Sequence, residues 1–376
     1  MHAPSTSYDA IVVGLGAVGS STTYELAKRG LRVLGLDRYA PPHSYGSSHG
    51  GSRIIREAYF EGSEYVPLVR RAYELWAELE RDSRVALLTP TGGLTIGAPD
   101  GELVSGALRS ARMHGIAHEL LGPKDVAQRF PEFRLDDGMA AVYEERAGVL
   151  DPEACVAASI AEAVKHGAEI RTGERVSNWS ASPGGVKVET ADGTVAGKTL
   201  VLATGAWLAA TLRPLNLGLW VERQVMHWFG PAARQTSAER VAAPVTVWQF
   251  SPDFMIHTTP DLGGGSKVAI HHSGEPVTPE TIRRDVSLQE VADIEALVAR
   301  YIPGLEPRVL RSATCMYTNT PDQHFLIDRM SARNVVIASA CSGHGFKFAP
   351  AVGEIVARLA TDADVQTPEL FKMRRA

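Results

Sequence analysis

The sequence predicts an α/β protein whose first part is built on parallel strands and whose second part is mostly antiparallel β-structure. Three observations predict it. The first forty residues read as strand, helix and strand, apolar strands return near residues 200 and 335, and the stretch between about 215 and 309 is rich in aromatic, His and Gly residues. At roughly 150 residues per domain, 376 residues are enough for two domains.

The first strand-to-helix turn has the glycine spacing of a dinucleotide site. Residues 8–13 and 31–36 are apolar runs on either side of a helical stretch. The turn carries three glycines in a G-x-G-x-x-G pattern: Gly14, Gly16 and Gly19. Missing side chains let backbone N–H groups and a helix N-terminus approach a pyrophosphate, and Asp37 can accept hydrogen bonds from a ribose. The alternative is an ordinary tight turn.

The spacing of apolar residues predicts the helices and strands that follow the first glycine turn. Apolar residues at helical spacing predict helices over 64–81, 152–167 and 289–300. Short apolar or alternating runs predict strands over 168–171, 175–180, 186–190 and 199–203, with a turn at 191–193. The last of these strands ends in Thr204-Gly205-Ala206-Trp207, which marks a return to the first layer.

A second glycine-rich turn lies near the C-terminus. The apolar run 335–339 leads through Gly343 and Gly345 into a helix predicted over 346–361. Each turn offers a helix N-terminus to negative charge, so the two chain ends are expected to meet around one large cofactor. A flavin dinucleotide suits this better than NAD, because the second helix can direct its positive end at the flavin's pyrimidine edge. The alternative is a glycine C-cap in a packing turn.

Two arginines stand among small residues in the loop before the helix 64–81. Arg53 and Arg56 are three residues apart, and the planar fork of arginine matches a carboxylate. From this chemistry alone, a solvated charged loop is an equally open reading.

Composition and charge exclude several classes of protein. With 44% hydrophobic and 22% charged residues the composition is that of a globular protein, and a net charge of −5 provides no basic surface for nucleic acid. No apolar run approaches the roughly 18 residues of a membrane span, and residues 1–8 lack the build of a signal peptide. We therefore expect a cytoplasmic protein without a membrane partner. Three scattered cysteines argue against a disulfide framework and a zinc site, and no metal is expected.

Six blocks of the sequence resemble one family. The blocks are Gly14 to Asp37, Pro41 to Arg56, Tyr65 to Leu68, Cys315 to Thr318, Asp322 to Asp328 and Ser342 to Phe348. In order and spacing they resemble monomeric sarcosine oxidase and N-methyltryptophan oxidase, which belong to the D-amino-acid-oxidase-like flavoproteins. The resemblance covers almost the whole chain. It implies a Rossmann-like FAD-binding domain (1–85, 148–214 and 313–376) and a second, antiparallel-sheet (α+β) substrate domain (86–147 and 215–312).

The resemblance also implies the reaction and its partners. It implies covalent FAD, oxidation of a secondary amine to an imine, reduction of O₂ to hydrogen peroxide, and hydrolysis of the imine in water. The partners are then a small amino acid and O₂, and we expect a monomer. Cys315 resembles the residue bonded through sulfur to the flavin 8α carbon. From chemistry alone it would be read as a buried inert cysteine, and Cys155 and Cys341 keep that reading.

Charged side chains take their roles from the same resemblance. Arg56 and Lys347 resemble the pair that binds the substrate carboxylate. His49 and Arg53 resemble groups near the flavin ring, where a cation favours the reduced, anionic form. Lys267 resembles the lysine that promotes reaction with O₂, a role with a physical basis because an ammonium stabilises superoxide.

The pocket residues complete the expected site. Tyr317 resembles a tyrosine at the carboxylate site and His271 the pocket histidine, whereas His272 should point to the other face of its strand and be structural. Further cofactor contacts are expected at Ser47, Val176, Gly205, Trp207, Gly343, His344, Gly345 and Phe346.

The expected pocket wall departs from that of the family's sarcosine oxidases. Where those enzymes carry Tyr and Phe on the strand before the lysine, this sequence places His257 and Thr259, so the wall is more polar. His227 and Trp248 either face the pocket or belong to the core. Sarcosine is therefore one candidate substrate beside other N-alkyl or cyclic secondary amino acids.

Three other functions stay open. The first is a dehydrogenase of the same fold that uses an acceptor other than O₂, against which Lys267 argues. The second is a nicotinamide-dependent reductase, which Cys315 and the long C-terminal cofactor block disfavour. The third is a flavin-binding protein without turnover, against which Arg56, Lys347 and Lys267 argue together.

Overall fold

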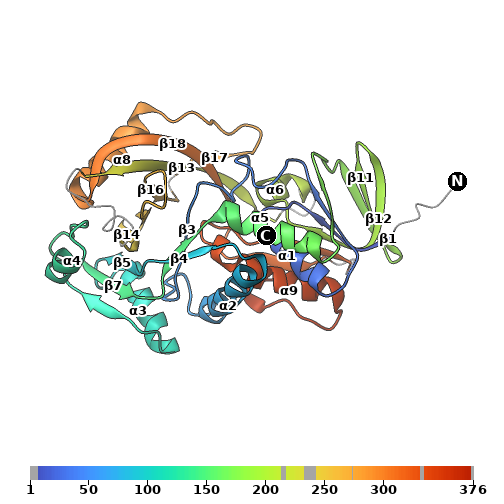
Figure 1. The fold of residues 1–376 in the computed structure, drawn as a ribbon, viewed down its shortest axis with the longest axis horizontal. Coiled ribbons are helices and arrows are strands. Elements are labelled where there is room, and N and C mark those ends of the chain that lie inside the picture. The colour runs from blue at the N-terminus through green and yellow to red at the C-terminus, as the bar shows by residue number, and fades with distance from the viewer. Residues whose placement is uncertain (1–6, 213–216, 233–242, 273, 331–333, 374–376) are drawn as a thin grey trace.

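Two large sheets of different character lie side by side along the molecule in the computed structural model, which describes residues 7–212, 217–232, 243–272, 274–330 and 334–373 (Figure 1). One sheet has eight strands and the other nine, and a small three-stranded sheet adds to them. Residues 1–6, which belong to the segment searched for a signal peptide, and the predicted domain boundary between 214 and 215 lie outside the described residues.

The eight-stranded sheet has the predicted parallel core. Its order is β10-β11-β12-β1-β2-β9, with β20 beside β12 and β19 beside β20, and strands β9, β2, β1, β12 and β20 run parallel. The strands are β1 Ser7–Val13, β2 Val33–Asp37, β9 Glu169–Thr172, β10 Asn178–Ser182, β11 Gly185–Thr190, β12 Gly193–Leu202, β19 Leu326–Arg329 and β20 Val335–Ser339. The strand predicted from residue 175 begins three residues later, after Glu174 has turned back to donate its N–H to the carbonyl of Asp37.

Helices cover one face of this sheet. They are α1 Ala17–Lys28, α2 Tyr65–Ser83, α5 Pro152–Lys165 and α9 Ala349–Thr361, and α1 packs between α5 and α9. The predicted C-terminal helix begins with a 3₁₀ turn, Phe346–Phe348, before α9. Alternate residues of β1 enter different cores, because Val12 faces the helices while Ile11 packs on the far side of the sheet.

The nine-stranded sheet is mostly antiparallel, as predicted. Its order is β17-β13-β16-β15-β14-β5-β7-β6, with β18 beside β13, and only β14 and β5 pair in parallel among its described strands. The strands are β5 Gly93–Gly97, β6 Glu119–Leu121, β7 Ala140–Glu144, β13 Trp220–Pro231, β14 Val245–Ser251, β15 Phe254–Thr259, β16 Ser266–His271, β17 Pro276–Val277 and β18 Leu305–Asn319. Helix α8, Leu288–Tyr301, packs on β18 and confirms the helix predicted over 289–300. Helices α3 Glu102–His114 and α4 Pro123–Arg129 had not been predicted.

Long strand β18 connects the two halves of the molecule. Figure 1 shows β13 and β18 arching from the far end of the nine-stranded sheet toward the eight-stranded sheet. The predicted domain boundary at 312/313 falls inside β18, and the division of the chain into two domains stays a prediction. The small sheet, β3 Arg53–Ile55, β8 Gly148–Leu150 and β4 Leu88–Pro90, holds the arginine loop beside this junction.

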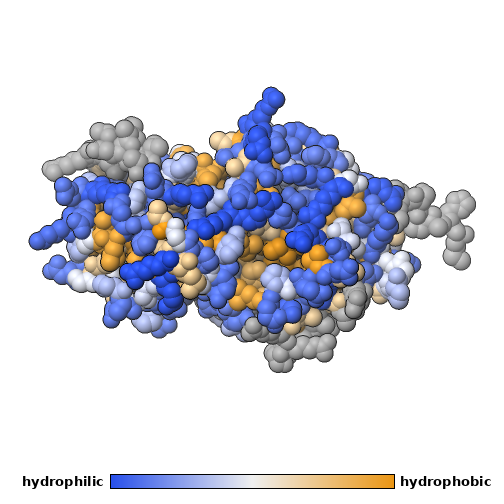
Figure 2. Space-filling view, turned by 90° about the horizontal axis from the view of Figure 1, so that it is seen from below, coloured by the Kyte–Doolittle hydropathy of each residue, from blue (hydrophilic) through white to orange (hydrophobic). Residues whose placement is uncertain are grey.

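The surface is hydrophilic over much of the face seen in Figure 2, with hydrophobic residues visible between the hydrophilic ones. Within the described ranges, no helix is both long and apolar enough to cross a membrane.

Candidate active site

A cavity of about 690 Å³ lies where the two sheets meet. This volume is within the roughly 300–1,000 Å³ of small-molecule and cofactor sites. Two of the predicted site residues, Gly19 and His49, do not line it. The predicted residues that do are Gly14, Gly16, Asp37, Ser47, Arg53, Arg56, Val176, Gly205, Trp207, His257, Lys267, His271, Cys315, Tyr317, Gly343, His344, Gly345, Phe346 and Lys347.

One end of the cavity is the start of α1. The N-cap Gly16 has no side chain to cap the helix, and the first turn holds no acidic residue. The N–H of Ala17 donates to the hydroxyl of Ser48 at 3.1 Å. A helix start carries partial positive charge and N–H donors, which is the environment that a pyrophosphate needs. Gly19 serves packing instead, because a Cβ there would lie 1.7 Å from the carbonyl oxygen of Gly14.

Asp37 closes the same end of the cavity at the tip of β2. Its Oδ2 accepts a hydrogen bond from the N–H of Leu15 at 2.7 Å, and its Oδ1 accepts one from Tyr39 at 2.8 Å. Two backbone donors therefore hold the carboxylate in place while it faces the cavity. Nearby, the hydroxyl of Thr204 is buried and has no hydrogen-bond partner within the described part of the chain, which leaves a polar atom available to a bound group.

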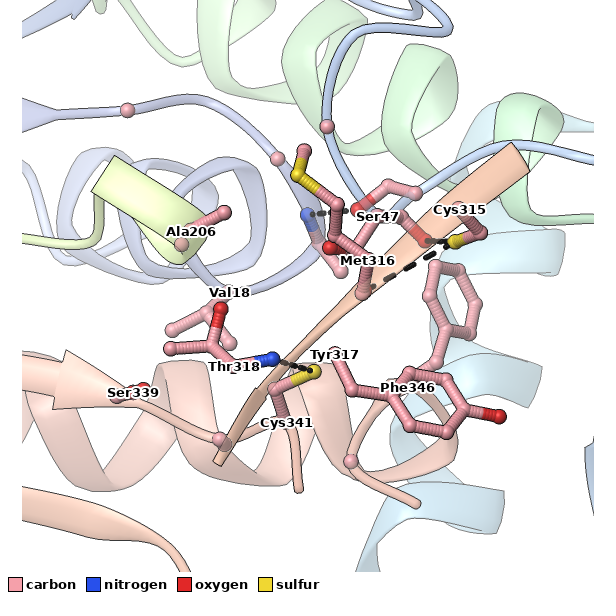
Figure 3. A pocket seen from close by; sticks show the side chains of 18 of the residues that line it. Val18, Ser47, Ala206, Cys315, Met316, Tyr317, Thr318, Ser339, Cys341 and Phe346 are labelled. Carbon is pink, nitrogen blue, oxygen red and sulfur yellow. Dashed lines mark hydrogen bonds between the residues drawn. The ribbon is translucent and has the colours of Figure 1, made fainter. Parts of the chain in front are cut away.

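Cys315 lines the middle of the cavity from strand β18. Its Sγ lies 3.8 Å from the carbonyl oxygen of Ser47 (Figure 3). A guanidinium nitrogen of Arg53 lies 3.8 Å from the same sulfur. Cys341 also lines the cavity but its Sγ accepts from the N–H of Thr318, and burial raises its pKa. Cys155 lies in α5 within the helical core, where burial raises its pKa as well.

The C-terminal glycine turn approaches the opposite wall closely. A Cβ on Gly343, whose φ is +76°, would lie 2.7 Å from Cε1 of His271 and 2.9 Å from Cε2 of Tyr317. Only a glycine fits both this backbone conformation and this contact. The two glycine-rich turns thus meet around one cavity, as the sequence predicted.

Lys267 is buried on strand β16, beside the arginine loop. Its Nζ donates hydrogen bonds to the carbonyl oxygens of Ser52 and Gly50, at 2.5 and 3.3 Å. Burial, reinforced by the positive charge of Arg53, lowers the pKa of Lys267 well below its ordinary value. The guanidinium of Arg53 donates to the carbonyls of Ser47 and Ser52 and lies 5.8 Å from the ring of Phe346.

The substrate-side wall carries neutral histidines. Strands β15 and β16 pair His257 with Ala269 and Thr259 with Lys267, so that these side chains and His271 alternate onto the cavity side. Burial, followed by the charge of Lys267, lowers the pKa of His257 to about 3, and burial also lowers that of His271. Nδ1 of His271 lies 3.3 Å from the hydroxyl of Tyr317.

Three other histidines lie off the cavity. Nδ1 of His272 lies 3.0 Å from Glu222, and His272 does not line the cavity. The prediction that it points to the other face of its strand is wrong, because β16 ends at His271 and His272, with a φ of +53°, brings its ring 4.3 Å from that of His271. His227 contacts Ser312 and does not line the cavity, and Trp248 belongs to the core of the nine-stranded sheet. His49 is buried, and burial lowers its pKa to about 4. A neutral His49 supplies no positive charge near the flavin ring, so Arg53 is the better candidate for that predicted role.

The two cations predicted to bind a carboxylate lie together, and one already has an acidic partner. Arg56 donates to Glu61 at 2.9 and 3.2 Å and to the carbonyl of Ala58 at 2.6 Å. Lys347 donates to the carbonyl of His344 at 2.8 Å, and burial, followed by the charge of Arg56, lowers its pKa to about 7. Although burial opposes it, Arg56 holds the pKa of Glu61 below its usual value.

Sequence reasoning missed Glu61. It stands five residues after Arg56 in a loop without periodicity, and the proximity of the two charges was its only signal. Within the described residues, no three or more His, Cys, Asp or Glu side chains are placed to hold a metal ion.

The chain matches the FAD dependent oxidoreductase family, DAO, over residues 9–359. It belongs to this family. It is 42% identical to a monomeric sarcosine oxidase of Streptomyces avermitilis, an alignment that covers 99% of this chain and 98% of the relative. It is 31% identical to an N-methyl-L-tryptophan oxidase of Yersinia pestis, over 94% of this chain and 95% of the relative.

Two solved structures of amino acid oxidases share the fold. A variant of NikD, described as an unusual amino acid oxidase essential for nikkomycin biosynthesis, superposes with a TM-score of 0.87 at 25% identity and covers 99% of this chain and 98% of NikD. Glycine oxidase from Geobacillus kaustophilus superposes with a TM-score of 0.82 over 98% of this chain and 99% of its own, and at 20% identity supports the fold alone. The predicted fold, FAD-dependent family and amine oxidase class are confirmed.

Glu61 competes with any carboxylate for Arg56, which generates a prediction. At about pH 6, where Lys347 is protonated, Glu61→Gln should tighten the binding of acetate to the holoenzyme by about three- to tenfold, or roughly 0.7–1.4 kcal/mol. Calorimetric titration measures the dissociation constant. Glu64→Gln, an exposed neighbour at the start of α2, is the control. Acetate affinity that is unchanged or weaker in Glu61→Gln contradicts the competition.

Proposed function

We propose that this oxidase converts N-alkyl or cyclic secondary amino acids to imines and transfers two electrons and two protons to O₂, which leaves as hydrogen peroxide. Water then hydrolyses the imine to an amine and a carbonyl compound. The observation that carries the proposal is one cavity lined by the buried cations Arg56, Lys347 and Lys267 together with the start of α1. The names of the Streptomyces and Yersinia relatives support a substrate of the N-methyl amino acid class.

The fit of the residues to FAD supports its place in this cavity. FAD, when bound, accepts two electrons from the amine and passes them to O₂. The start of α1 would hold its pyrophosphate and Asp37 its ribose. Arg53 and the turn before Phe346 would surround its ring, and Cys315 would hold it by a covalent bond through Sγ.

The charges of Arg56 and Lys347 in the cavity fit the carboxylate of an amino acid. Arg56 and Lys347 would bind its carboxylate with charge-assisted hydrogen bonds. His257 and His271 are polar but uncharged, so they would not repel a substrate ammonium as imidazolium ions would. The enzyme would act as a monomer, and its cytoplasmic location stays a prediction.

The test of this function separates its two half-reactions. Lys267→Met should leave anaerobic oxidation of the amino acid unchanged and slow the half-reaction with O₂ by about a hundredfold or more, because the ammonium stabilises charge that develops on oxygen. In the wild type the O₂ half-reaction should slow as pH rises through the lowered pKa of Lys267, and the variant should lose this dependence. Stopped-flow mixing measures both rates.

The runner-up function gives a different result in this experiment. A dehydrogenase of the same fold would react slowly with O₂ in both proteins, and its electrons would pass to an artificial dye acceptor without peroxide release. Normal O₂ reaction in Lys267→Met would remove the lysine from the mechanism.

Covalent attachment of FAD through Cys315 is a second prediction. After acid precipitation the wild-type protein should keep its yellow colour in the pellet, whereas Cys315→Ser should release all flavin to the supernatant, because a hydroxyl cannot form the thioether. Cys341→Ser is the matched control, since it removes another thiol that lines the cavity. A colourless wild-type pellet would exclude the covalent bond.

The polar wall at His257 predicts the substrate preference. Sarcosine should be a poor substrate compared with a bulkier or more polar secondary amino acid, and His257→Tyr should shift the ratio of kcat/KM toward sarcosine. Peroxide release across a panel of N-methyl and cyclic amino acids measures both ratios. Ile256→Val, on the other face of β15, is the control. A ratio altered by less than about threefold, roughly 0.7 kcal/mol, would mean that His257 does not select the substrate.

A further inference from the structure

Tyr59 lies against both carboxylate-binding cations without lining the cavity. Its ring centroid is 4.7 Å from Cζ of Arg56 and 5.1 Å from Nζ of Lys347, and its hydroxyl is 3.3 Å from the same Nζ. We infer that Tyr59 is a positioning residue that orients Arg56 and Lys347 for the anionic group of the substrate. The inference rests on the proposed function, which assigns these two cations to the carboxylate.

Each hydrogen bond around Tyr59 has a defined donor and acceptor. An ammonium can only donate, so the hydroxyl oxygen of Tyr59 accepts from Lys347 and its proton points to Nδ1 of His344, 2.7 Å away. His344 must then carry its proton on Nε2, which donates to the carbonyl of Gln323 at 3.1 Å. Burial supports these protonation states, because it raises the pKa of Tyr59 and lowers that of His344 to about 4. The relay therefore links Lys347 to a fixed backbone carbonyl.

Rigid neighbours hold Tyr59 in this place. Its side chain is fully buried, and its ring packs 5.2 Å from the rings of Tyr65 and Phe348. The hydroxyl of Ser110, on α3, donates to its backbone carbonyl. Helices α2 and α3 and the 3₁₀ turn before α9 thus fix the tyrosine. The fixed tyrosine in turn restricts the side chains of Arg56 and Lys347, which it contacts.

Loss of the Tyr59 hydroxyl should change the pH dependence of acetate binding. Of the charged groups around Lys347, Arg56 disfavours its ammonium form and Glu61 favours it. Across the cavity His257 and His271 are neutral, as are His344 and Tyr59 beside it. Because carboxylate binding requires the ammonium, acetate affinity should fall as pH rises past about 7. Without its acceptor on Tyr59 the ammonium is less stabilised, so this fall should begin at lower pH.

The experiment compares two Tyr→Phe variants from one aromatic cluster. Tyr59→Phe removes the hydroxyl and keeps the ring beside Arg56. Tyr65→Phe is the control, because its hydroxyl contacts His324 at 3.0 Å and neither cation. Acetate dissociation constants of the holoenzymes are measured by calorimetry between about pH 5.5 and 9. Tyr59→Phe should raise the constant about three- to tenfold at about pH 6 and move the pH midpoint down, and Tyr65→Phe should match the wild type.

Lys347→Met in the same titration tests the underlying site. If Lys347→Met binds acetate as the wild type does, the carboxylate site of the proposed function is wrong. If Lys347→Met weakens binding but Tyr59→Phe behaves like Tyr65→Phe, the positioning role of Tyr59 is overturned while the proposed function stands. Should Tyr59→Phe fail to fold, His344→Phe removes the acceptor that directs the Tyr59 proton away from Lys347, so the hydroxyl oxygen is no longer held toward the ammonium. The same downward shift of the midpoint is then expected, and an unchanged pH profile overturns the inference.

Discussion

Backbone carbonyls that face buried cations are the constraint on which the site depends. The loop between residues 47 and 58 directs carbonyl oxygens at the buried Arg56 and Lys267 and at the half-buried Arg53. Burying a charge is costly unless hydrogen bonds replace its water, and these carbonyls do so without cancelling the charge. Arg56 also pairs with Glu61, whereas Arg53 and Lys267 have no acidic partner among the described residues, so these two give the cavity a positive potential. Such a potential stabilises negative charge on a cofactor ring, on oxygen or on a carboxylate.

Burial opposes the ammonium forms of Lys267 and Lys347, and it also keeps the histidines of the cavity wall neutral. Burial and the positive charges nearby both favour the unprotonated imidazole at His257 and His271. The wall over the substrate is thus polar without adding to the positive charge. Glu61 is the exception on this side, and its pairing with Arg56 limits how strongly the free site attracts anions.

The sequence was sufficient for the parts of the molecule that have local signals. Strand β20 was predicted at its observed bounds, and helix α8 within one residue at each end, because strong periodicity marks both. The glycine turns were found from their spacing, whereas Cys315 and Lys267 were found through family resemblance. Helices α3 and α4 were not predicted at all.

Contacts made by tertiary packing could not be predicted in this way. Tyr59 meets His344 across 285 residues of sequence, and nothing near either residue marks the pair. The same is true of His49, whose family role suggested a cation but whose burial makes it neutral. Charge state and partner choice depend on what packs around a group, which periodicity and motif spacing do not encode.

The pairing register of strand β18 with β13 determines where Cys315 and Tyr317 lie in the cavity. Cys315 and Tyr317 are two residues apart, so they share a face of the strand and are separated by one pleat repeat, about 6.6–6.8 Å. Pairing with β13 is regular from Arg311 to Asn319, and the irregularities lie toward the distal end of the strand. Insertions there can be absorbed before they reach the cavity. A one-residue slip of the regular segment would turn both side chains to the opposite face at once.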